Sequence, residues 1–237
     1  MSQQAESLST TQIADNLRQI RARIQAAAER AGRDPAEITL IAVSKTKPLS
    51  LLQAAFEAGQ VDFGENKVQE MDDKQPQLPH AHWHLIGNLQ RNKVKYLAPY
   101  VHLIHSLDSE KLMKEIDKRA AQAERVIGCL IQINISEEDQ KGGLDEASAR
   151  ALIERLDDYP HVAIRGVMGL AEFTGDEAVI RRQFRRLRQA ADQLATLSHP
   201  RLHLQEISMG MSGDFEIAIE EGSTMVRVGS AIFGARG

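Results

Sequence analysis

The chain has 237 residues, 42% hydrophobic and 26% charged, which is ordinary for a globular protein and excludes a wholly disordered chain. Lys and Arg number 29 against 33 Asp and Glu, a formal net charge of −4, so binding to nucleic acid through bulk charge is not expected. The single cysteine, Cys129, excludes an intramolecular disulfide and an all-cysteine metal cage, and it fits a reducing, cytoplasmic setting.

The N-terminal region carries neither a secretory signal nor a membrane anchor by its pattern, and no run of 18 apolar residues occurs anywhere in the chain. Residues 1–11 are expected to be flexible. Apolar residues at spacings of three and four then predict an additional helix over residues 12–31. Thr10 or Thr11 is expected to cap its start, and Gly32 to mark its end.

Short apolar runs then alternate with helical segments along the rest of the chain. The predicted strands cover residues 38–43, 61–63, 81–86, 101–105, 126–134, 162–168, 202–207 and 224–228. The predicted helices include residues 51–58, 88–96, 109–125, 146–156, 177–197 and 214–220. Strict alternation demands parallel strands with right-handed crossovers. Eight such units predict an α/β fold, a (β/α)8 TIM barrel forming one domain over residues 1–237, with a doubly wound open sheet as the alternative.

Serine and glycine gather after the seventh and eighth predicted strands, where barrels often bind phosphate. Ser208, Gly210 and Ser212 follow the seventh strand, and Gly229 and Ser230 follow the eighth. Glycine lets the backbone approach an anion, and serine adds a hydroxyl donor. Ordinary turns between strand and helix favour the same residues, so this alternative stays open.

Lys45 ends the first predicted strand, where a partly desolvated amine can attack a carbonyl carbon. Lys47 has the same parity along the strand, but Pro48 pushes Lys47 into an extended conformation leaving the barrel. Lys45 is therefore the preferred Schiff-base lysine, against the alternative of a surface lysine at a strand end. A lysine opposite a phosphate site indicates pyridoxal phosphate or a phosphorylated sugar.

Several motifs in chain order carry a resemblance to one known family. They are Ile41-Ala-Val-Ser-Lys-Thr-Lys-Pro48, Phe63-Gly-Glu-Asn66 with Gln69-Glu70, Trp83-His-Leu-Ile-Gly87, Leu130-Ile-Gln-Ile-Asn134, Arg165-Gly-Val-Met168, Ser208-Met-Gly-Met-Ser212 and Val226-Arg-Val-Gly-Ser230. Together they resemble the pyridoxal phosphate homeostasis proteins, which are related to the N-terminal barrel of alanine racemase. The match runs from about residue 12 to 235.

The resemblance implies a role for each motif. Lys45 would carry pyridoxal 5'-phosphate as an internal aldimine, and Arg227 would face the pyridine nitrogen. The residues implied around the phosphate are Ser208, Gly210, Met211, Ser212, Gly229 and Ser230. Asn66 and Met168 match positions near the ring.

The implied function is intracellular storage and delivery of the cofactor without efficient catalysis. A guanidinium stays charged, so Arg227 would leave the pyridine nitrogen unprotonated and the ring a weak electron sink. A racemase of this fold adds a domain that supplies a tyrosine base. This chain is expected to end with the barrel, and Tyr96, Tyr100 and Tyr159 lie at no predicted strand mouth. A weak amino-acid racemase is the alternative, and a Schiff-base aldolase is disfavoured because the sixth strand carries no lysine.

The expected partners are the cofactor and, transiently, apo pyridoxal enzymes; the chain is expected to be a cytoplasmic monomer. No metal is expected: His80, His82 and His84 alternate, but no carboxylate or cysteine lies nearby in sequence. His84 is interpreted as a polar residue at the barrel mouth. The arginines of the helix over 177–197 are interpreted as a solvated outer face, with an anionic partner as the alternative.

Overall fold

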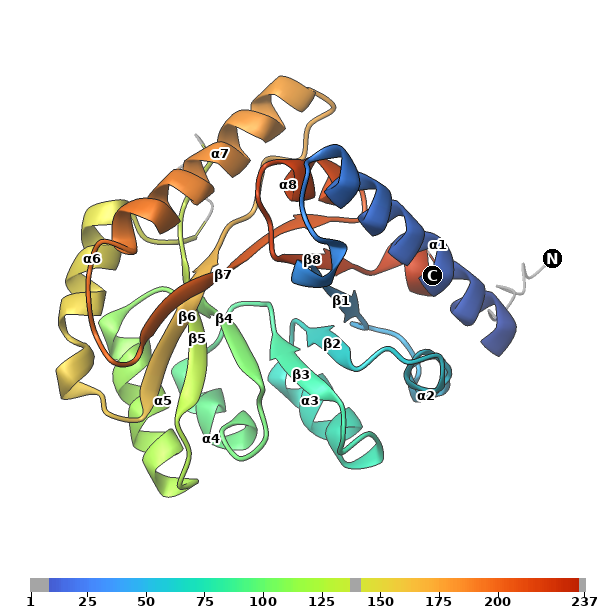
Figure 1. Cartoon of the computed structure of the whole chain (residues 1–237). Helices are drawn as coiled ribbons and strands as arrows, with labels where there is room; N and C mark the ends of the chain where they lie inside the picture. Colours follow the sequence, from blue (N-terminus) through green and yellow to red (C-terminus); the bar gives the residue numbers. More distant parts are fainter. Residues whose placement is uncertain (1–8, 137–141, 235–237) are drawn as a thin grey trace.

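The strands of this computed structural model, which describes residues 9–136 and 142–234, form a closed parallel barrel. They are β1 (Thr39–Val43), β2 (Asp62–Glu65), β3 (His82–Leu85), β4 (Leu103–Leu107), β5 (Ile127–Gln132), β6 (Val162–Met168), β7 (Leu202–Met211) and β8 (Met225–Val228). Neighbours in sequence pair with one another, and β8 pairs with β1 (Figure 1). The predicted TIM barrel is confirmed, and the open-sheet alternative is wrong.

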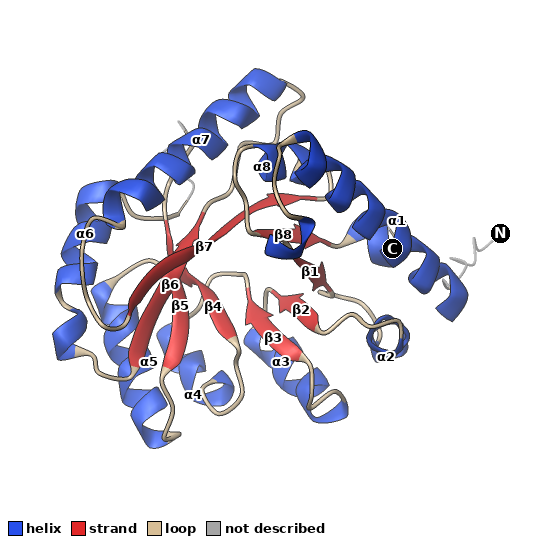
Figure 2. Cartoon of the chain, in the orientation of Figure 1, coloured by secondary structure: helices blue, strands red, loops and turns tan. Residues whose placement is uncertain are grey.

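Helices surround the ring of strands (Figure 2). They are α1 (Thr10–Arg30), α2 (Leu49–Glu57), α3 (Val68–Lys74), α4 (Val94–Leu97), α5 (Glu110–Gln122), α6 (Glu146–Glu154), α7 (Glu177–Leu194), α8 (Phe215–Glu220) and α9 (Ser230–Phe233). The additional helix α1 packs against α2 and α8, so it covers the barrel beside the junction of β1 and β8. The last helix, α9, was not expected from the sequence.

The additional helix begins two residues before its predicted start. Ser9 caps it, and the expectation that Thr10 or Thr11 would do so is wrong. The Ser9 hydroxyl accepts from the backbone N–H of Gln12, whose side chain accepts from the Ser9 N–H, so this pair satisfies two N–H groups at once. Residues 1–8 lie outside the described part of the chain. The predicted apolar stripe is buried, and Gly32 adopts a left-handed φ of 66° just past the helix end.

Two predicted elements differ in extent. The helix expected over residues 88–96 is only a 3-10 turn, Arg91–Lys93, followed by the single α-turn of α4. Leu89 is buried before that turn, in a segment that is neither helix nor strand. The seventh strand continues to Met211 instead of ending at 207, so Ser208 and Gly210 lie within β7 and not in the loop that follows.

The core has two parts. A large apolar cluster fills the layer between the strands and the helices. A small one lies inside the barrel and consists of Ile41, Leu103, Leu130, Met168 and Met225. The rest of the interior includes buried polar side chains, among them His84, His105, Ser208 and Arg227. These polar residues connect the barrel interior to the site described below.

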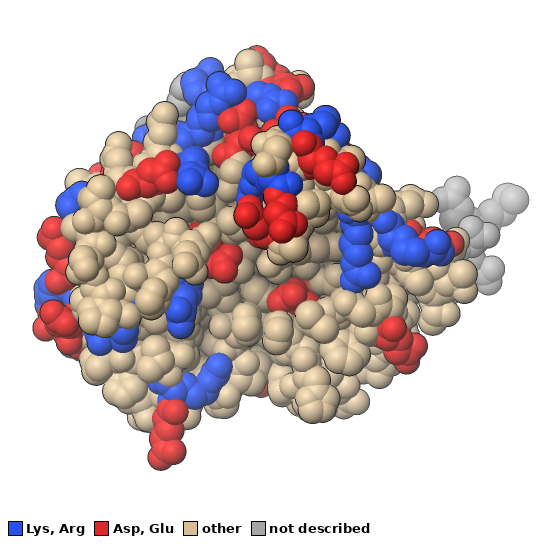
Figure 3. Space-filling view, in the orientation of Figure 1, with Lys and Arg blue, Asp and Glu red and all other residues tan. Residues whose placement is uncertain are grey.

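Charged side chains on the outer surface are mixed in sign (Figure 3). On α7, Arg181 binds Glu177, Glu220 and Glu221, and Arg185 binds Glu221 as well. These ion pairs join α7 to the end of α8, which agrees with the interpretation of an outer barrel face. None of the helices in the described parts of the chain combines the length and apolar character needed to cross a bilayer.

Candidate cofactor site

A cavity of about 500 Å³ opens at the C-terminal ends of the strands, within the range of roughly 300–1,000 Å³ that small-molecule sites occupy. Its wall contains seven of the ten candidate residues: Lys45, Asn66, Met211, Ser212, Arg227, Gly229 and Ser230. The structure therefore brings the ends of β1, β2, β7 and β8 together around one space, as the sequence predicted.

Three candidates lie outside this wall. Met168 belongs to the apolar cluster inside the barrel, and Ser208 is fully buried within the barrel. Gly210 has a φ of 92°, and a Cβ there would lie 2.5 Å from the Cβ of Ala218 on α8. Glycine is therefore required at 210 for backbone conformation and close packing of α8.

Strand alternation directs Lys45 into the cavity. Ile41 lies inside the barrel, and Val43 and Lys45 follow it on the same side and line the cavity. Lys47 also lines the cavity, and its amine donates to the carbonyl oxygen of Gly234 at 3.0 Å. Lys45 and Lys47 therefore both face the cavity, as their shared position in the strand alternation predicted. Lys47 differs in its contact with Gly234 at the end of α9.

A buried ion pair lies next to the lysine loop, formed by residues that do not line the cavity. Ser44 donates through its hydroxyl to Glu65 Oε1 at 2.7 Å. The Lys74 amine, on α3, donates to the same carboxylate oxygen at 2.7 Å and to the Ser44 carbonyl at 2.9 Å. Burial raises the pKa of Glu65, and the contacts with Lys74 and Ser44 oppose that shift. Lys74 therefore ties the end of β1 to β2 and α3.

Thr46, between the two lysines, has a left-handed φ of 63°, which is unfavourable for a β-branched residue. Its backbone N–H donates to Glu70 Oε1 at 2.5 Å, and Lys74 donates to the same oxygen at 2.7 Å. Glu70 thus holds the strained turn that follows Lys45. This contact gives a structural reason for the Gln69-Glu70 motif, which the sequence alone left without a role.

Arg227 lines the cavity but is largely buried, with 4% of its surface exposed. Its guanidinium donates to the Ser208 hydroxyl at 2.5 Å and to the Gly169 carbonyl at 3.1 Å. Burial lowers its pKa to about 10, with Asp214 opposing the shift, so the guanidinium remains protonated at neutral pH. Arg227 can therefore present a fixed positive charge and N–H donors to whatever occupies the cavity.

A chain of hydrogen bonds leads from Arg227 through the barrel interior. The Ser208 hydroxyl lies 2.9 Å from His105 Nδ1, and His105 Nε2 lies 3.0 Å from His84 Nδ1. His84 Nε2 in turn lies 3.1 Å from Asp62 Oδ1 at the other end of the barrel. Burial, then the neighbouring His84 and Arg227, hold the pKa of His105 well below its ordinary value, so its ring is neutral. Sequence spacing gave no signal for this chain, because its members come from separate strands.

The loops after β7 and β8 contact each other directly. The Gly229 backbone N–H donates to the Ser212 hydroxyl at 3.2 Å. A Cβ at Gly229 would lie 3.1 Å from the Val43 carbonyl oxygen, so this residue packs closely against the end of β1. The Ser212 hydroxyl and the backbone at Gly229 thus meet at one part of the wall, and hydroxyl and backbone N–H groups are the kinds of donor that a phosphate group requires.

The rim of the cavity is partly apolar, which the sequence did not indicate. Leu170, Phe173 and Met211 line the cavity and rank among the exposed large hydrophobic side chains, and Phe173 is fully exposed. Phe173 and Leu170 belong to the segment between β6 and α7. Periodicity could not identify them, because they lie in no regular element.

The family follows from comparison with known sequences. A family model described as the N-terminal domain of alanine racemase matches residues 15–237. The chain is 42% identical over 229 residues to the pyridoxal phosphate homeostasis protein of Escherichia coli K12, covering 94% of this chain and 97% of that protein. The chain belongs to the family of the pyridoxal phosphate homeostasis proteins.

Solved structures agree with that membership. PipY of Synechococcus elongatus, whose structure has been solved with pyridoxal phosphate bound, is 36% identical, with a TM-score of 0.82 over 94% of this chain and 100% of PipY. Alanine racemase from Bacillus anthracis is 14% identical and shares the fold, with a TM-score of 0.72 over 96% of this chain and 56% of the racemase. The homeostasis family and the racemase thus share this barrel.

Proposed function

We propose that this chain binds pyridoxal 5'-phosphate as a Schiff base on Lys45 and stores or delivers the cofactor in the cytoplasm, without efficient catalysis. The observation that carries the proposal is the convergence of Lys45, Arg227 and the Ser212–Gly229 contact on one cavity. The names of the relatives support it, since the Escherichia coli protein is a pyridoxal phosphate homeostasis protein and PipY was solved with the cofactor bound.

The donor set of the cavity fits the three parts of the cofactor. An amine at Lys45 suits its aldehyde carbon, and the serine hydroxyls and backbone N–H groups near Ser212 and Gly229 suit its phosphate. The protonated Arg227 suits an unprotonated pyridine nitrogen, which accepts a hydrogen bond. When bound, the cofactor supplies a carbonyl carbon for imine exchange and a ring that withdraws electrons from it.

Two features of the wall favour binding over turnover. Arg227 would keep the ring nitrogen of a bound cofactor unprotonated, which would make the ring a weak electron sink. Within the described part of the chain, no tyrosine or histidine lines the cavity. Tyr100 donates to Asp72, and Tyr159 donates to Glu110, so these hydroxyls are engaged elsewhere. Lack of a positioned tyrosine or histidine would remove a rate factor of about 10²–10⁴, although the carboxylates of Glu172 and Asp214 line the cavity.

Borohydride reduction and peptide mapping of the loaded protein test the lysine assignment. The pyridoxyl group is expected on Lys45, and Lys45→Ala is expected to lose the Schiff-base absorbance band. Lys47→Ala is the matched control and should keep that band. A pyridoxyl group found only on Lys47 or on another lysine would overturn the assignment.

The delivery half of the proposal is tested by mixing the loaded protein with an apo pyridoxal enzyme and measuring the reactivation of that enzyme. Panels of L- and D-amino acids followed by chiral chromatography test the non-catalytic half. We expect transfer, and turnover far below the usual kcat of about 1–10³ s⁻¹. Racemisation at ordinary enzymatic rates would instead establish the racemase alternative.

A further inference from the structure

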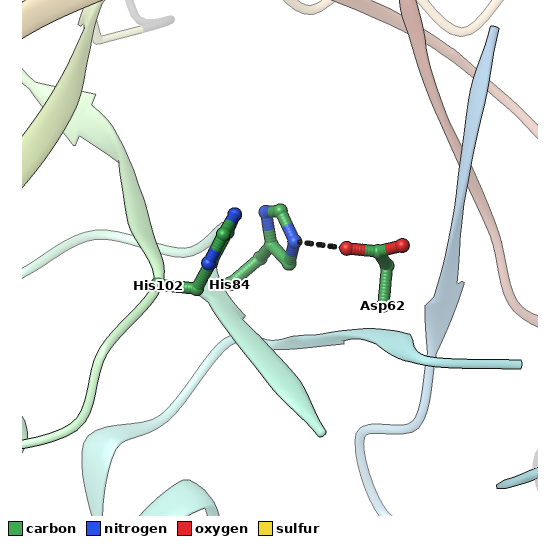
Figure 4. Close-up of side chains that lie close together, drawn as sticks. All are labelled: Asp62, His84 and His102. Atoms are coloured by element: carbon green, nitrogen blue, oxygen red, sulfur yellow. Dashed lines mark hydrogen bonds and ion pairs between the residues drawn. The ribbon is translucent and has the colours of Figure 1, made fainter. Parts of the chain in front are cut away.

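Imidazole and carboxylate side chains gather at the N-terminal end of the barrel, opposite the cavity that contains Lys45. Asp62 is the first residue of β2, His84 lies in β3, and His102 directly precedes β4. One potential ligand atom from each lies within 4.8 Å of those of the other two. Figure 4 shows His84 between Asp62 and His102 in this view. Strand register creates the group, so the spacing of histidines along the sequence did not indicate it.

The pair formed by Asp62 and His84 already has the separation that a metal ion needs. Asp62 Oδ1 and His84 Nε2 lie 3.1 Å apart. Two ligands at typical zinc distances of about 2.1 Å and at a tetrahedral angle are about 3.4 Å apart. An ion can therefore replace the proton between these two atoms with a shift of a few tenths of an ångström.

The surroundings fix the rings, as they do in established metal sites. His84 Nδ1 lies 3.0 Å from His105 Nε2, which orients the other ring nitrogen toward Asp62. His82 stacks on His102 with ring centroids 4.4 Å apart, and its Nδ1 lies 3.1 Å from Asp62 Oδ1. The His84 side chain is almost fully buried, whereas Asp62 is partly exposed and His102 exposed, so an ion has access from solvent.

We propose that Asp62, His84 and His102 form a binding site for a divalent first-row transition metal, best matched by zinc, at the N-terminal mouth of the barrel. Two imidazoles and one carboxylate favour such an ion over calcium or magnesium, which take mainly oxygen ligands. The ion connects β2, β3 and the start of β4. Because β3 and β4 share only two register pairs, it stabilises a short ladder of the barrel.

Titration of the full-length, tag-free protein with zinc chloride tests the proposal, with calorimetry and thermal unfolding as readouts. One zinc per chain and a rise in Tm are expected. His102→Ala and Asp62→Asn should each weaken binding about 100-fold or more, since removal of outer-shell partners alone typically costs 10–100-fold. His80→Ala is the matched control, because His80 is exposed and outside the group, and it should bind zinc normally. Cys129 is buried and should not compete.

Cobalt gives a readout on the wild-type protein, free of any folding defect in the variants. A site of two nitrogens and one carboxylate oxygen should produce visible ligand-field absorption that zinc displaces. Absence of that absorption together with absence of stoichiometric zinc binding would overturn the proposal, as would full binding by His102→Ala. Lys45→Ala should still bind zinc, so a failure of the cofactor proposal leaves this test intact.

Discussion

Arg227 and Ser208 form a buried pair 2.5 Å apart, with the guanidinium of β8 donating to a hydroxyl of β7. The sequence motif that contains Ser208 led us to expect it beside the phosphate. In the fold, Ser208 is fully buried and lies between Arg227 and His105. Its hydroxyl therefore holds the arginine that would face the cofactor ring, which is a positioning role.

Ser208→Ala should lower the free energy of unfolding by about 1–3 kcal/mol, because it leaves one guanidinium N–H and His105 Nδ1 without their buried partner. Urea denaturation measures this change. Ser148→Ala, at an exposed serine of α6, should change stability by less than about 0.5 kcal/mol. Equal effects of the two substitutions would show that the Ser208 contact contributes little.

Arg227 should keep the pyridine nitrogen of bound cofactor unprotonated. Its pKa of about 10 leaves it charged at neutral pH, and a charged donor beside the nitrogen opposes protonation of the ring. Nitrogen NMR of cofactor labelled at the ring position reports this state directly. Arg227→Gln, which removes the charge and retains donors, should move the signal toward the protonated range. A protonated nitrogen in the unaltered protein would contradict this role for Arg227.

Glu70→Ala should weaken cofactor binding roughly tenfold, since it removes the acceptor that holds Thr46 in its left-handed conformation beside Lys45, a contact of about 1–1.5 kcal/mol. Fluorescence titration of the apo protein with pyridoxal phosphate measures the effect. Glu57→Ala, at an exposed glutamate of α2, is the control. If the two variants bind equally well, the turn at Thr46 does not depend on Glu70.

Glu65 should make stability fall with rising pH. Its pKa is raised in the folded state by burial, so the folded chain binds this proton more tightly than the unfolded chain does. The stabilisation is complete below the ordinary carboxyl pKa and is lost as pH rises through the raised value. Urea midpoints measured across that range should fall in the unaltered protein relative to Glu65→Gln, which cannot ionise. Parallel pH profiles would show that Glu65 does not titrate in this way.

Much of the fold could be predicted because it rests on local pattern. The buried strand Ile38–Val43 and the apolar stripe of α1 are visible in sequence, and strict alternation then fixes the parallel order. Closure of the barrel could only be inferred from the presence of eight strand–helix units. The pairing of β1 with β8, which the sequence does not show, establishes it. Element ends were less accurate: the left-handed Gly210 lies within β7, and local pattern placed it in a turn.

The site was predictable where strand ends specify it and not where tertiary contacts do. Lys45 was selected by its place at a strand end and by the following Pro48, and Arg227 by the resemblance of its motif, and both line the cavity. The contact between Glu70 and Thr46 joins α3 to the lysine loop, and the pairing of His84 with Asp62 depends on the register of β2 and β3. Such contacts between distant residues leave no periodic trace in a single sequence.

The first and last helices are joined by a hydrogen bond from the Asn16 amide on α1 to the Ile232 carbonyl on α9, at 2.9 Å. The helix α9 starts at Ser230, which lines the cavity. The N-terminal helix is therefore bonded to the helix that begins at the cavity wall, and its docking affects how firmly that part of the wall is held. Loosening α1 should speed escape of a bound small molecule even though no residue of α1 lines the cavity.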